Sequence, residues 1–305
     1  MTHAEPVAAR AHADRFEADR EKIERGLDQI CEAYLTGLPA GVSAAIRYGL
    51  KSPGKRLRPL LLIFAYRAAG GDGDATLLAC APEIVHSYSL MHDDLPCMDD
   101  DDMRRGRPTV HKVYGSRVAI VGGVAMIPLA GMVARDAVRQ MGLPESAATA
   151  ILETLLDAAG SRGMIGGQQR DLAGEGLSLP LDEREAVHSA KTGALIVGSV
   201  RMGALAAGAN DAAVEALHRY GKDIGLAFQI MDDVLDVTST TSALGKSTGR
   251  DAVLGKSTYP ALLGVDGARQ RARTLIDDGL ESLRASGMLT QELSQVANFM
   301  VTRTS

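Results

Sequence analysis

The chain has 305 residues, 46% of them hydrophobic and 23% charged, and its formal net charge is −5. This composition is typical of a globular protein, and the negative charge gives no electrostatic reason to expect binding to nucleic acid or to an anionic membrane. The three cysteines (Cys31, Cys80 and Cys97) form no disulfide framework and lack zinc-ligand spacing, which favours a reducing compartment. Because the charged N-terminus has no apolar signal core and no run of 18 apolar residues occurs, we expect a cytoplasmic protein with no membrane span.

Helical periodicity dominates the chain, and the alternating pattern of β-strands is nearly missing. Ala- and Leu-rich segments predict helices near 56–69, 74–94, 116–141, 145–173 and 183–208. The strongest helix is expected over 211–237, where Leu217, Phe228 and Leu235 recur on one face. Breaks are predicted at 70–74, Pro144, Pro180 and 208–211. No change of composition divides the chain, so the sequence predicts a single all-α domain over residues 1–305.

The segment 92–109 reads HDDLPCMDDDDMRRGRPT, with six aspartates within ten residues. Adjacent like charges repel, so this cluster destabilises the fold unless cations neutralise it. Oxygen ligands of this kind suit Mg²⁺. Pro96 should end the preceding helix near Asp94, and Asp99 should return from a short bulge. The alternative interpretation is a solvated acidic loop.

A second acidic motif, DDVLD at 232–236, lies on the strongest predicted helix. Asp232 and Asp236 are four residues apart and share a face, and Gln229 extends it by one turn. Two Asp-rich motifs on separate helices can face each other and clamp a metal–diphosphate complex.

Basic and polar residues complete the candidate site, since arginine forks match diphosphate oxygens. His86 lies two helical turns before Asp93 and either donates to phosphate or has a structural role. Any single lysine, taken alone, favours a surface position over a ligand role. The candidates are Lys55, Arg56, Arg58, His86, Arg104, Arg105, Lys191, Thr192, Lys246 and Lys256.

These motifs resemble those of the trans-type polyprenyl synthases, in the same order and over nearly the whole chain. The matching segments are GKRLRP (54–59), VHSYSLMHDDLPCMDDDDMRRG (85–106), GMIGGQQRDL (163–172), KTGALI (191–196), GLAFQIMDDVLD (225–236) and LGKSTYPALLG (254–264). The inserted pair Pro96 and Cys97 is similar to bacterial farnesyl diphosphate synthases and related geranylgeranyl diphosphate synthases. The resemblance implies mostly antiparallel helices around a deep central cavity, and a homodimer.

The resemblance also implies residue roles. Three Mg²⁺ ions would be ligated by Asp93, Asp99 and Asp232, with Asp94, Asp233 and Asp236 as close support. The allylic diphosphate would be held by Arg104, Lys191 and Lys246, with Lys256 a further candidate, and isopentenyl diphosphate by Lys55, Arg58, His86 and Arg105. Thr192 and Gln229 would point oxygen dipoles at the developing allylic cation.

The implied reaction begins when the metals and cations stabilise the departing diphosphate, so that the allylic carbon–oxygen bond ionises. The double bond of isopentenyl diphosphate then attacks, and a proton is lost to the released diphosphate in a cavity that excludes water. Two rivals remain: a class I terpene cyclase, which would need no isopentenyl diphosphate, and a non-catalytic subunit of a heteromeric synthase, which should lack one Asp motif.

Two features bear on product length. The family's AGDALL-like stretch is VGGVAMIPLAG at 121–131, where Pro128 predicts a kink or break and Gly131 replaces an aromatic. Tyr88 and Ser89 precede Asp93 by five and four residues, about 6–7.5 Å along a helix. In the family an aromatic at this place is associated with the fifteen-carbon product, which favours farnesyl over geranylgeranyl diphosphate, although core packing is the commoner role of a helical aromatic.

Overall fold

The computed structural model describes residues 7–174, 177, 179–238 and 258–302, with side chains from Phe16 onward. In these ranges the chain is an all-α bundle, apart from one hairpin of β1 (Met103–Arg104) and β2 (Arg107–Pro108). The helices are α1 (Val7–Tyr34), α2 (Ala40–Leu50), α3 (Leu57–Ala68), α4 (Thr76–Asp93), α5 (Val110–Tyr114), α6 (Ser116–Gln140), α7 (Glu145–Ala159), α8 (Met164–Ala173), α9 (Leu181–His188), α10 (Ala194–Ala206), α11 (Asp211–Thr238), α14 (Tyr259–Ala285) and α15 (Gln291–Thr302).

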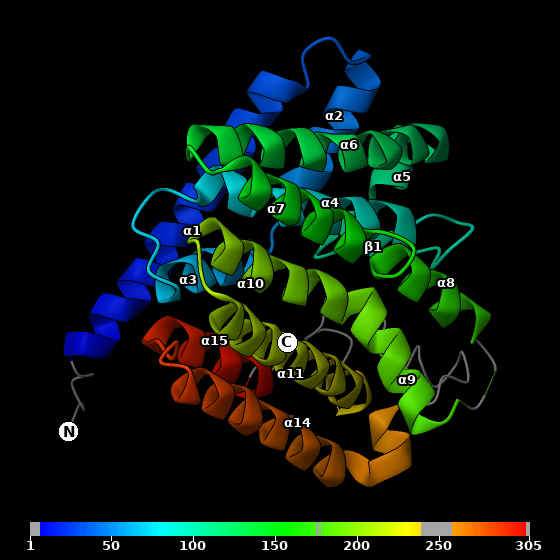
Figure 1. The fold of residues 1–305 in the computed structure, drawn as a ribbon. Coiled ribbons are helices and arrows are strands. Elements are labelled where there is room, and N and C mark those ends of the chain that lie inside the picture. The colour runs from blue at the N-terminus through cyan, green and yellow to red at the C-terminus, as the bar shows by residue number, and fades with distance from the viewer. Residues whose placement is uncertain (1–6, 175–176, 178, 239–257, 303–305) are drawn as a thin grey trace.

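The long helices lie side by side, with α6 near one end of the stack and α14 at the other (Figure 1). α4 packs against α6 and α3, α10 contacts α3, α7 and α11, and α11 packs along α14. One hydrophobic core extends from Ile23 on α1 to Met300 on α15. α3 is apolar on nearly all sides, and Leu60, Leu61 and Leu62 are each 0% exposed, as expected of a central helix.

Two of the predicted helices are interrupted. The segment predicted as one helix over 145–173 is α7 and α8, separated by a turn bounded by Gly160 and Gly163, residues of low helix propensity. The segment predicted over 183–208 begins at Leu181 and contains a π-helical turn, η1 (Ser189–Gly193), between α9 and α10. Wide turns of this kind often occur at functional sites.

Of the kink or break predicted at Pro128, the break is wrong, because α6 continues from Ser116 to Gln140 with the proline inside it. Pro128 and Val124 are exposed, so water can reach the Val124 carbonyl that loses its amide partner. The opposite face of the helix is buried through Met126, Leu129 and Val133. Packing of this face on α4 and α2 outweighs the cost of the proline.

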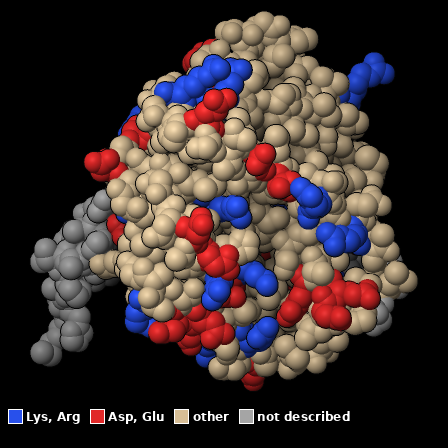
Figure 2. Space-filling view, in the orientation of Figure 1, with Lys and Arg blue, Asp and Glu red and all other residues tan. Residues whose placement is uncertain are grey.

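Among the described helices, α6 is the one long and apolar enough to cross a membrane, and 44% of its most apolar window is buried inside the bundle. The surface seen in Figure 2 carries acidic and basic side chains in small interspersed groups. A binding face for nucleic acid would show basic side chains gathered in one patch.

Asp223 on α11 gives a stability prediction. Burial, and then the charge of Asp278 on α14, raises the pKa of the Asp223 carboxyl from 3.8 to about 6. Because its pKa is higher in the folded state, ionisation of Asp223 destabilises the fold as the pH rises through 6 and has little effect near pH 4. We expect Asp223→Asn to raise the free energy of unfolding by about 1 kcal/mol at pH 8, allowing for solvent screening, in urea titrations. Asp277→Asn is the control, because Asp277 is an exposed neighbour of Asp278. If Asp223→Asn raised the free energy of unfolding as much at pH 4 as at pH 8, ionisation of Asp223 would not be the cause.

Candidate active site

The loop before α3 is fixed by Arg56, which has a left-handed backbone (φ 50°) and a side chain only 2% exposed. Its guanidinium pairs with Glu24 and Glu83 at 2.7 and 2.8 Å and donates to the carbonyls of Leu50 and Ser52. The sequence grouped Arg56 with the cations of the site, but its contacts make it an internal anchor of the loop that carries Lys55 and Arg58.

Arg58, His86 and Arg105 form a cationic group beside this loop. Burial lowers the pKa of Arg58 to about 10, with Arg105 adding to the shift and Glu83 and Asp232 opposing it. Burial, followed by the charges of Arg58 and Arg105, holds the pKa of His86 well below its usual 6.5. Two arginines that repel each other, beside an uncharged imidazole that can donate one ring N–H, suit an anion-binding site. The structure therefore brings together three of the four residues expected to hold isopentenyl diphosphate.

Two contacts bring Arg105 to the loop. Its Nη1 donates to the carbonyl of Pro53 at 2.7 Å. A Cβ at Gly54 would lie 2.6 Å from the same nitrogen, so a side chain there would push Arg105 away. The fourth expected residue, Lys55, is exposed, and its Nζ lies 5.3 Å from the centroid of the Phe299 ring on α15.

The acidic loop after α4 has the predicted shape. α4 ends at Asp93, and the Asp99 amide donates to the Asp93 carbonyl at 2.8 Å, so Asp99 does return to the helix end. Burial raises the pKa of Asp93 to about 6, with Lys191 opposing the shift and Asp99 adding to it. Half-buried carboxylates that repel each other offer oxygen ligands whose charge a bound cation would neutralise. The donor set therefore fits Mg²⁺.

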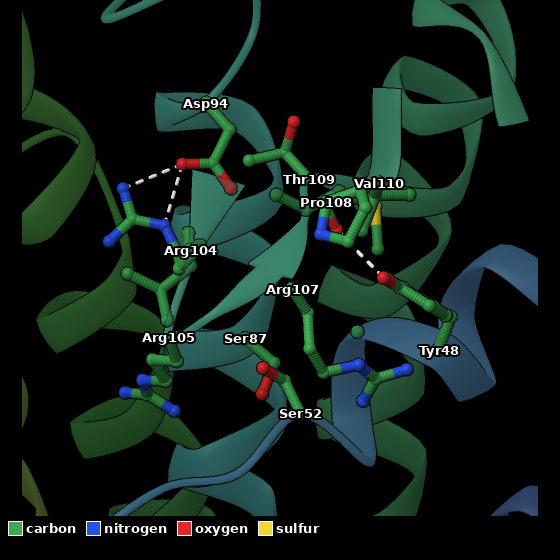
Figure 3. Close-up of a pocket in the computed structure, with 13 residues that line it drawn as sticks. Tyr48, Ser52, Ser87, Asp94, Arg104, Arg105, Arg107, Pro108, Thr109 and Val110 are labelled. Atoms are coloured by element: carbon green, nitrogen blue, oxygen red, sulfur yellow. Dashed lines mark hydrogen bonds and ion pairs between the residues drawn. The ribbon is translucent and has the colours of Figure 1, made fainter. Parts of the chain in front are cut away.

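Asp94 is turned to a different partner. It is 3% exposed and accepts from Arg104 at 2.6 Å, and burial raises the pKa of its carboxyl to about 6 while Arg104 opposes the shift. Figure 3 shows Arg104 meeting Asp94, while Arg105 points away from it. Tyr48 fixes the hairpin behind them, since its hydroxyl donates to the Pro108 carbonyl at 2.7 Å.

Lys191 lies on η1, against α8. Its Nζ is 2.6 Å from Asp171, and its pKa is raised because the charges of Asp171 and Asp93 outweigh the opposing effect of burial. A Cβ at Gly167 would lie 2.2 Å from the Lys191 amide, so glycine permits this close approach of α8. No role was predicted for Asp171 from the sequence. Its position in the segment 163–172, which matches the family, was the signal that could have found it.

Thr192 and Gln229 contact each other, because the threonine hydroxyl donates to the Gln229 Oε1 at 3.0 Å. The expected direction of their oxygen dipoles toward an allylic cation stays a prediction. Next on α11, Asp232 and Asp236 are half-buried on one face. Asp233 is 2% exposed and turned toward α14, where it accepts from the Tyr259 amide at 3.1 Å, with Arg184 3.9 Å away. These contacts favour a structural role for Asp233, in which it holds α11 to α14, over the metal-binding support expected from the sequence.

The candidate chain-length residues lie on α4. Tyr88 is 8% exposed, and its ring meets His92 edge-on with centroids 5.0 Å apart. Ser89 is half-buried and donates to the His86 carbonyl at 2.9 Å. Lys246 and Lys256 lie outside the described residues.

The polyprenyl synthetase family model matches residues 39–294. The chain is 43% identical over 300 residues to a farnesyl diphosphate synthase of Escherichia coli, covering 94% of this chain and 99% of the relative. It is 42% identical over 254 residues to a chloroplastic geranylgeranyl pyrophosphate synthase of Catharanthus roseus, covering 83% and 71%. A geranyltransferase from Helicobacter pylori, solved with magnesium and isoprenyl diphosphate, has a TM-score of 0.80 at 29% identity and covers 99% of this chain and 98% of its own. The predicted all-α isoprenoid-synthase fold is confirmed, and the chain belongs to the polyprenyl synthetase family.

Proposed function

We propose that this chain joins dimethylallyl or geranyl diphosphate head to tail to isopentenyl diphosphate, giving farnesyl diphosphate and diphosphate. The observation that carries this proposal is the presence of two cationic groups at one acidic site. One group is Arg58, His86 and Arg105, and the other is Lys191 beside Asp93. Two groups suit a reaction with two diphosphate substrates, whereas a terpene cyclase needs only one.

Asp93, Asp99 and Asp232 would hold Mg²⁺, with three ions proposed and with Asp94 and Asp236 close by. When bound, Mg²⁺ neutralises the charge that develops on the leaving diphosphate. The oxygen-only donors and the raised pKa of Asp93, caused first by burial, support this assignment.

The chain's own residues then divide the remaining work. Lys191 and Arg104 would orient the allylic diphosphate, and the Arg58 group would orient isopentenyl diphosphate. Because the Thr192 hydroxyl donates to Gln229, the lone pairs of the threonine oxygen remain available to an allylic cation. The proton lost after carbon–carbon bond formation would pass to the released diphosphate. Buried side chains such as Tyr88 would keep water from the cation.

The test is product analysis by mass spectrometry. The purified chain is incubated with Mg²⁺, isopentenyl diphosphate and each allylic diphosphate in turn, or with a single allylic diphosphate alone. We expect a fifteen-carbon diphosphate only when isopentenyl diphosphate is present. Cyclised hydrocarbon without isopentenyl diphosphate would indicate a terpene cyclase, and no product would indicate a non-catalytic subunit; either result contradicts the proposal.

The two diphosphate positions should separate kinetically. Arg58→Ala is expected to raise the KM for isopentenyl diphosphate by roughly 10–100-fold, since it removes a charge-assisted donor from one group. Lys191→Ala should weaken use of the allylic substrate by a similar factor and leave the KM for isopentenyl diphosphate within about twofold. Steady-state kinetics varying one substrate at a time measures both effects. Arg67→Ala is the control, because the Arg67 side chain pairs with Asp19 in another part of the bundle. If Arg58→Ala and Lys191→Ala affect the KM values of both substrates equally, the chain does not have two distinct diphosphate positions.

The outer face of α6 supports a homodimer. Ile120, Val121, Val124 and Met132 are 39–56% exposed on this helix. Apolar side chains gathered on one face are typical of a surface covered by a partner, and sedimentation of the purified chain would show the dimer.

The free cysteines support the expected cytoplasmic location, because Cys31, Cys80 and Cys97 form no disulfide.

Geranylgeranyl diphosphate is the alternative product. Apart from the neighbouring residues and backbone of α6 itself, no described atom lies within 4 Å of where a Cβ on Gly131 would stand, so this position leaves open space beside α6. Tyr88 weighs more, because its ring is buried five residues from Asp93 on the helix that leads to the metal site.

A further inference from the structure

Asp100, Asp102 and His111 form a cluster separate from the residues assigned above. One carboxylate oxygen from each aspartate and one ring nitrogen of the histidine lie within 4.8 Å of one another. Asp100 and Asp102 are exposed at the end of the acidic loop, and His111, on α5, is 6% exposed beneath them. The cluster thus combines two accessible carboxylates with one buried imidazole.

The histidine is held with one nitrogen unused. Its Nδ1 lies 3.1 Å from the Thr109 hydroxyl, which itself donates to the Asp102 carbonyl at 3.4 Å. In the tautomer in which Nδ1–H donates to Thr109 Oγ1, the hydroxyl proton goes to the Asp102 carbonyl and the Nε2 lone pair is left to bind an ion. Nε2 is buried and has no hydrogen-bond partner among the described residues. An unsatisfied buried nitrogen destabilises the fold, and a bound ion would satisfy it.

The backbone around the cluster is already set. The Thr109 amide donates to the Asp102 carbonyl at 3.0 Å, directly beside the β1–β2 pairing of Met103 with Pro108. Asp102 and His111, nine residues apart, are therefore brought together by the hairpin before any ion binds. Preorganised ligands bind an ion with less loss of conformational entropy than ligands on a free loop.

We propose that Asp100, Asp102 and His111 bind one divalent transition-metal ion of the Zn²⁺ class, at a site additional to the Mg²⁺ ligands Asp93, Asp99 and Asp232. Imidazole suits Zn²⁺ and its neighbours in the first transition row, whereas Mg²⁺ prefers oxygen ligands alone. Water would complete the coordination, because both aspartates are open to solvent. Asp100 directly follows Asp99, so the bound ion would also hold the segment that presents Asp99 to the catalytic site.

Lys112 competes for the site. Its Nζ lies 2.8 Å from Asp102 Oδ1, and its side chain is 48% exposed. An exposed ion pair of this kind contributes little to stability, so a dication can displace it. Removing this lysine charge should therefore strengthen binding, which gives the proposal a gain-of-affinity test as well as a loss-of-affinity test.

Equilibrium dialysis of the full chain with Zn²⁺ tests the proposal. The Asp93→Asn/Asp232→Asn variant removes catalytic ligands and is expected to retain one bound Zn²⁺. In this background Asp100→Asn and Asp102→Asn should each weaken the affinity at least about tenfold, and Lys112→Met should strengthen it severalfold. Asp101→Asn is the matched control, because Asp101 lies between the two ligands but contacts Arg104 at 3.5 Å. It should change the affinity less than about twofold.

A spectroscopic measurement identifies the histidine. In ¹⁵N-labelled protein, Zn²⁺ should shift the Nε2 resonance of His111, and Asp102→Asn should abolish the shift at the same ion concentration. Loss of Zn²⁺ binding in the Asp93→Asn/Asp232→Asn background would overturn the proposal, as would an equal loss from Asp101→Asn or an unshifted His111. None of these outcomes bears on the prenyl-transfer assay, which is run in Mg²⁺.

Discussion

Asp93→Ala and Asp232→Ala are each expected to lower kcat by roughly a thousandfold at saturating Mg²⁺, about 4 kcal/mol in the activation free energy. Each change removes a carboxylate proposed to hold the ions that stabilise the leaving diphosphate. Asp93 lies at the end of α4 beside Asp99, and Asp232 lies within electrostatic reach of Arg58. Steady-state assays of product formation measure the loss.

The fold should survive Asp93→Ala. Burial and the charge of Asp99 already disfavour its ionised form, so without Mg²⁺ the variant should be at least as stable to urea as the original chain. Lys191 keeps its pair with Asp171. Asp72→Ala, at an exposed loop position, is the control for a simple loss of charge. Turnover near the original rate from Asp93→Ala or Asp232→Ala would remove the basis for the metal-binding assignment.

Local sequence signals predicted the acidic half of the site. Pro96 restricts the backbone before it, so α4 had to end near Asp94. The spacing of Asp232 and Asp236 places both on one face of α11, whereas Asp233 is rotated away from them and meets Tyr259. Helical periodicity alone was enough to separate Asp233 from its neighbours, and assigning it a metal role followed the family pattern instead.

Long-range contacts decided what the sequence could not predict. Arg56 is an anchor because Glu24 and Glu83 are 32 and 27 residues away in the chain, a pairing that no local pattern contains. The π-helical turn that carries Lys191 depends on the close approach of Gly167 from α8. α6 remains continuous at Pro128 because tertiary packing overrides helix propensity. A residue's role could be predicted from the sequence where its partner lies within one or two turns of the same helix. It could not be predicted from local patterns where the partner lies on another helix.

Tyr88→Ala is expected to shift the main product from fifteen to twenty or more carbons. Tyr88 precedes Asp93 by five residues, so its ring lies about 7.5 Å along α4 from the metal end. The ring is 8% exposed and braced edge-on by His92, whose Nε2 lies 3.1 Å from the Ile120 carbonyl on α6. In the proposed role, this braced aromatic would be a floor that a short prenyl chain reaches and a longer one cannot pass. Removing it would then leave room for a longer chain on the side of α6.

The main product of Tyr88→Ala is expected to change, and two variants serve as controls. Tyr88→Phe keeps the ring and should still give fifteen carbons, while Ser89→Ala removes only a hydroxyl that donates to the His86 carbonyl and should also leave the product unchanged. Since truncating a buried aromatic costs about 3–5 kcal/mol, the assays are run below the measured Tm of the variant. Mass analysis of the products decides the question. A twenty-carbon product from the original chain, or an unchanged product from Tyr88→Ala, would show that Tyr88 is core packing and that the floor lies elsewhere along the cavity.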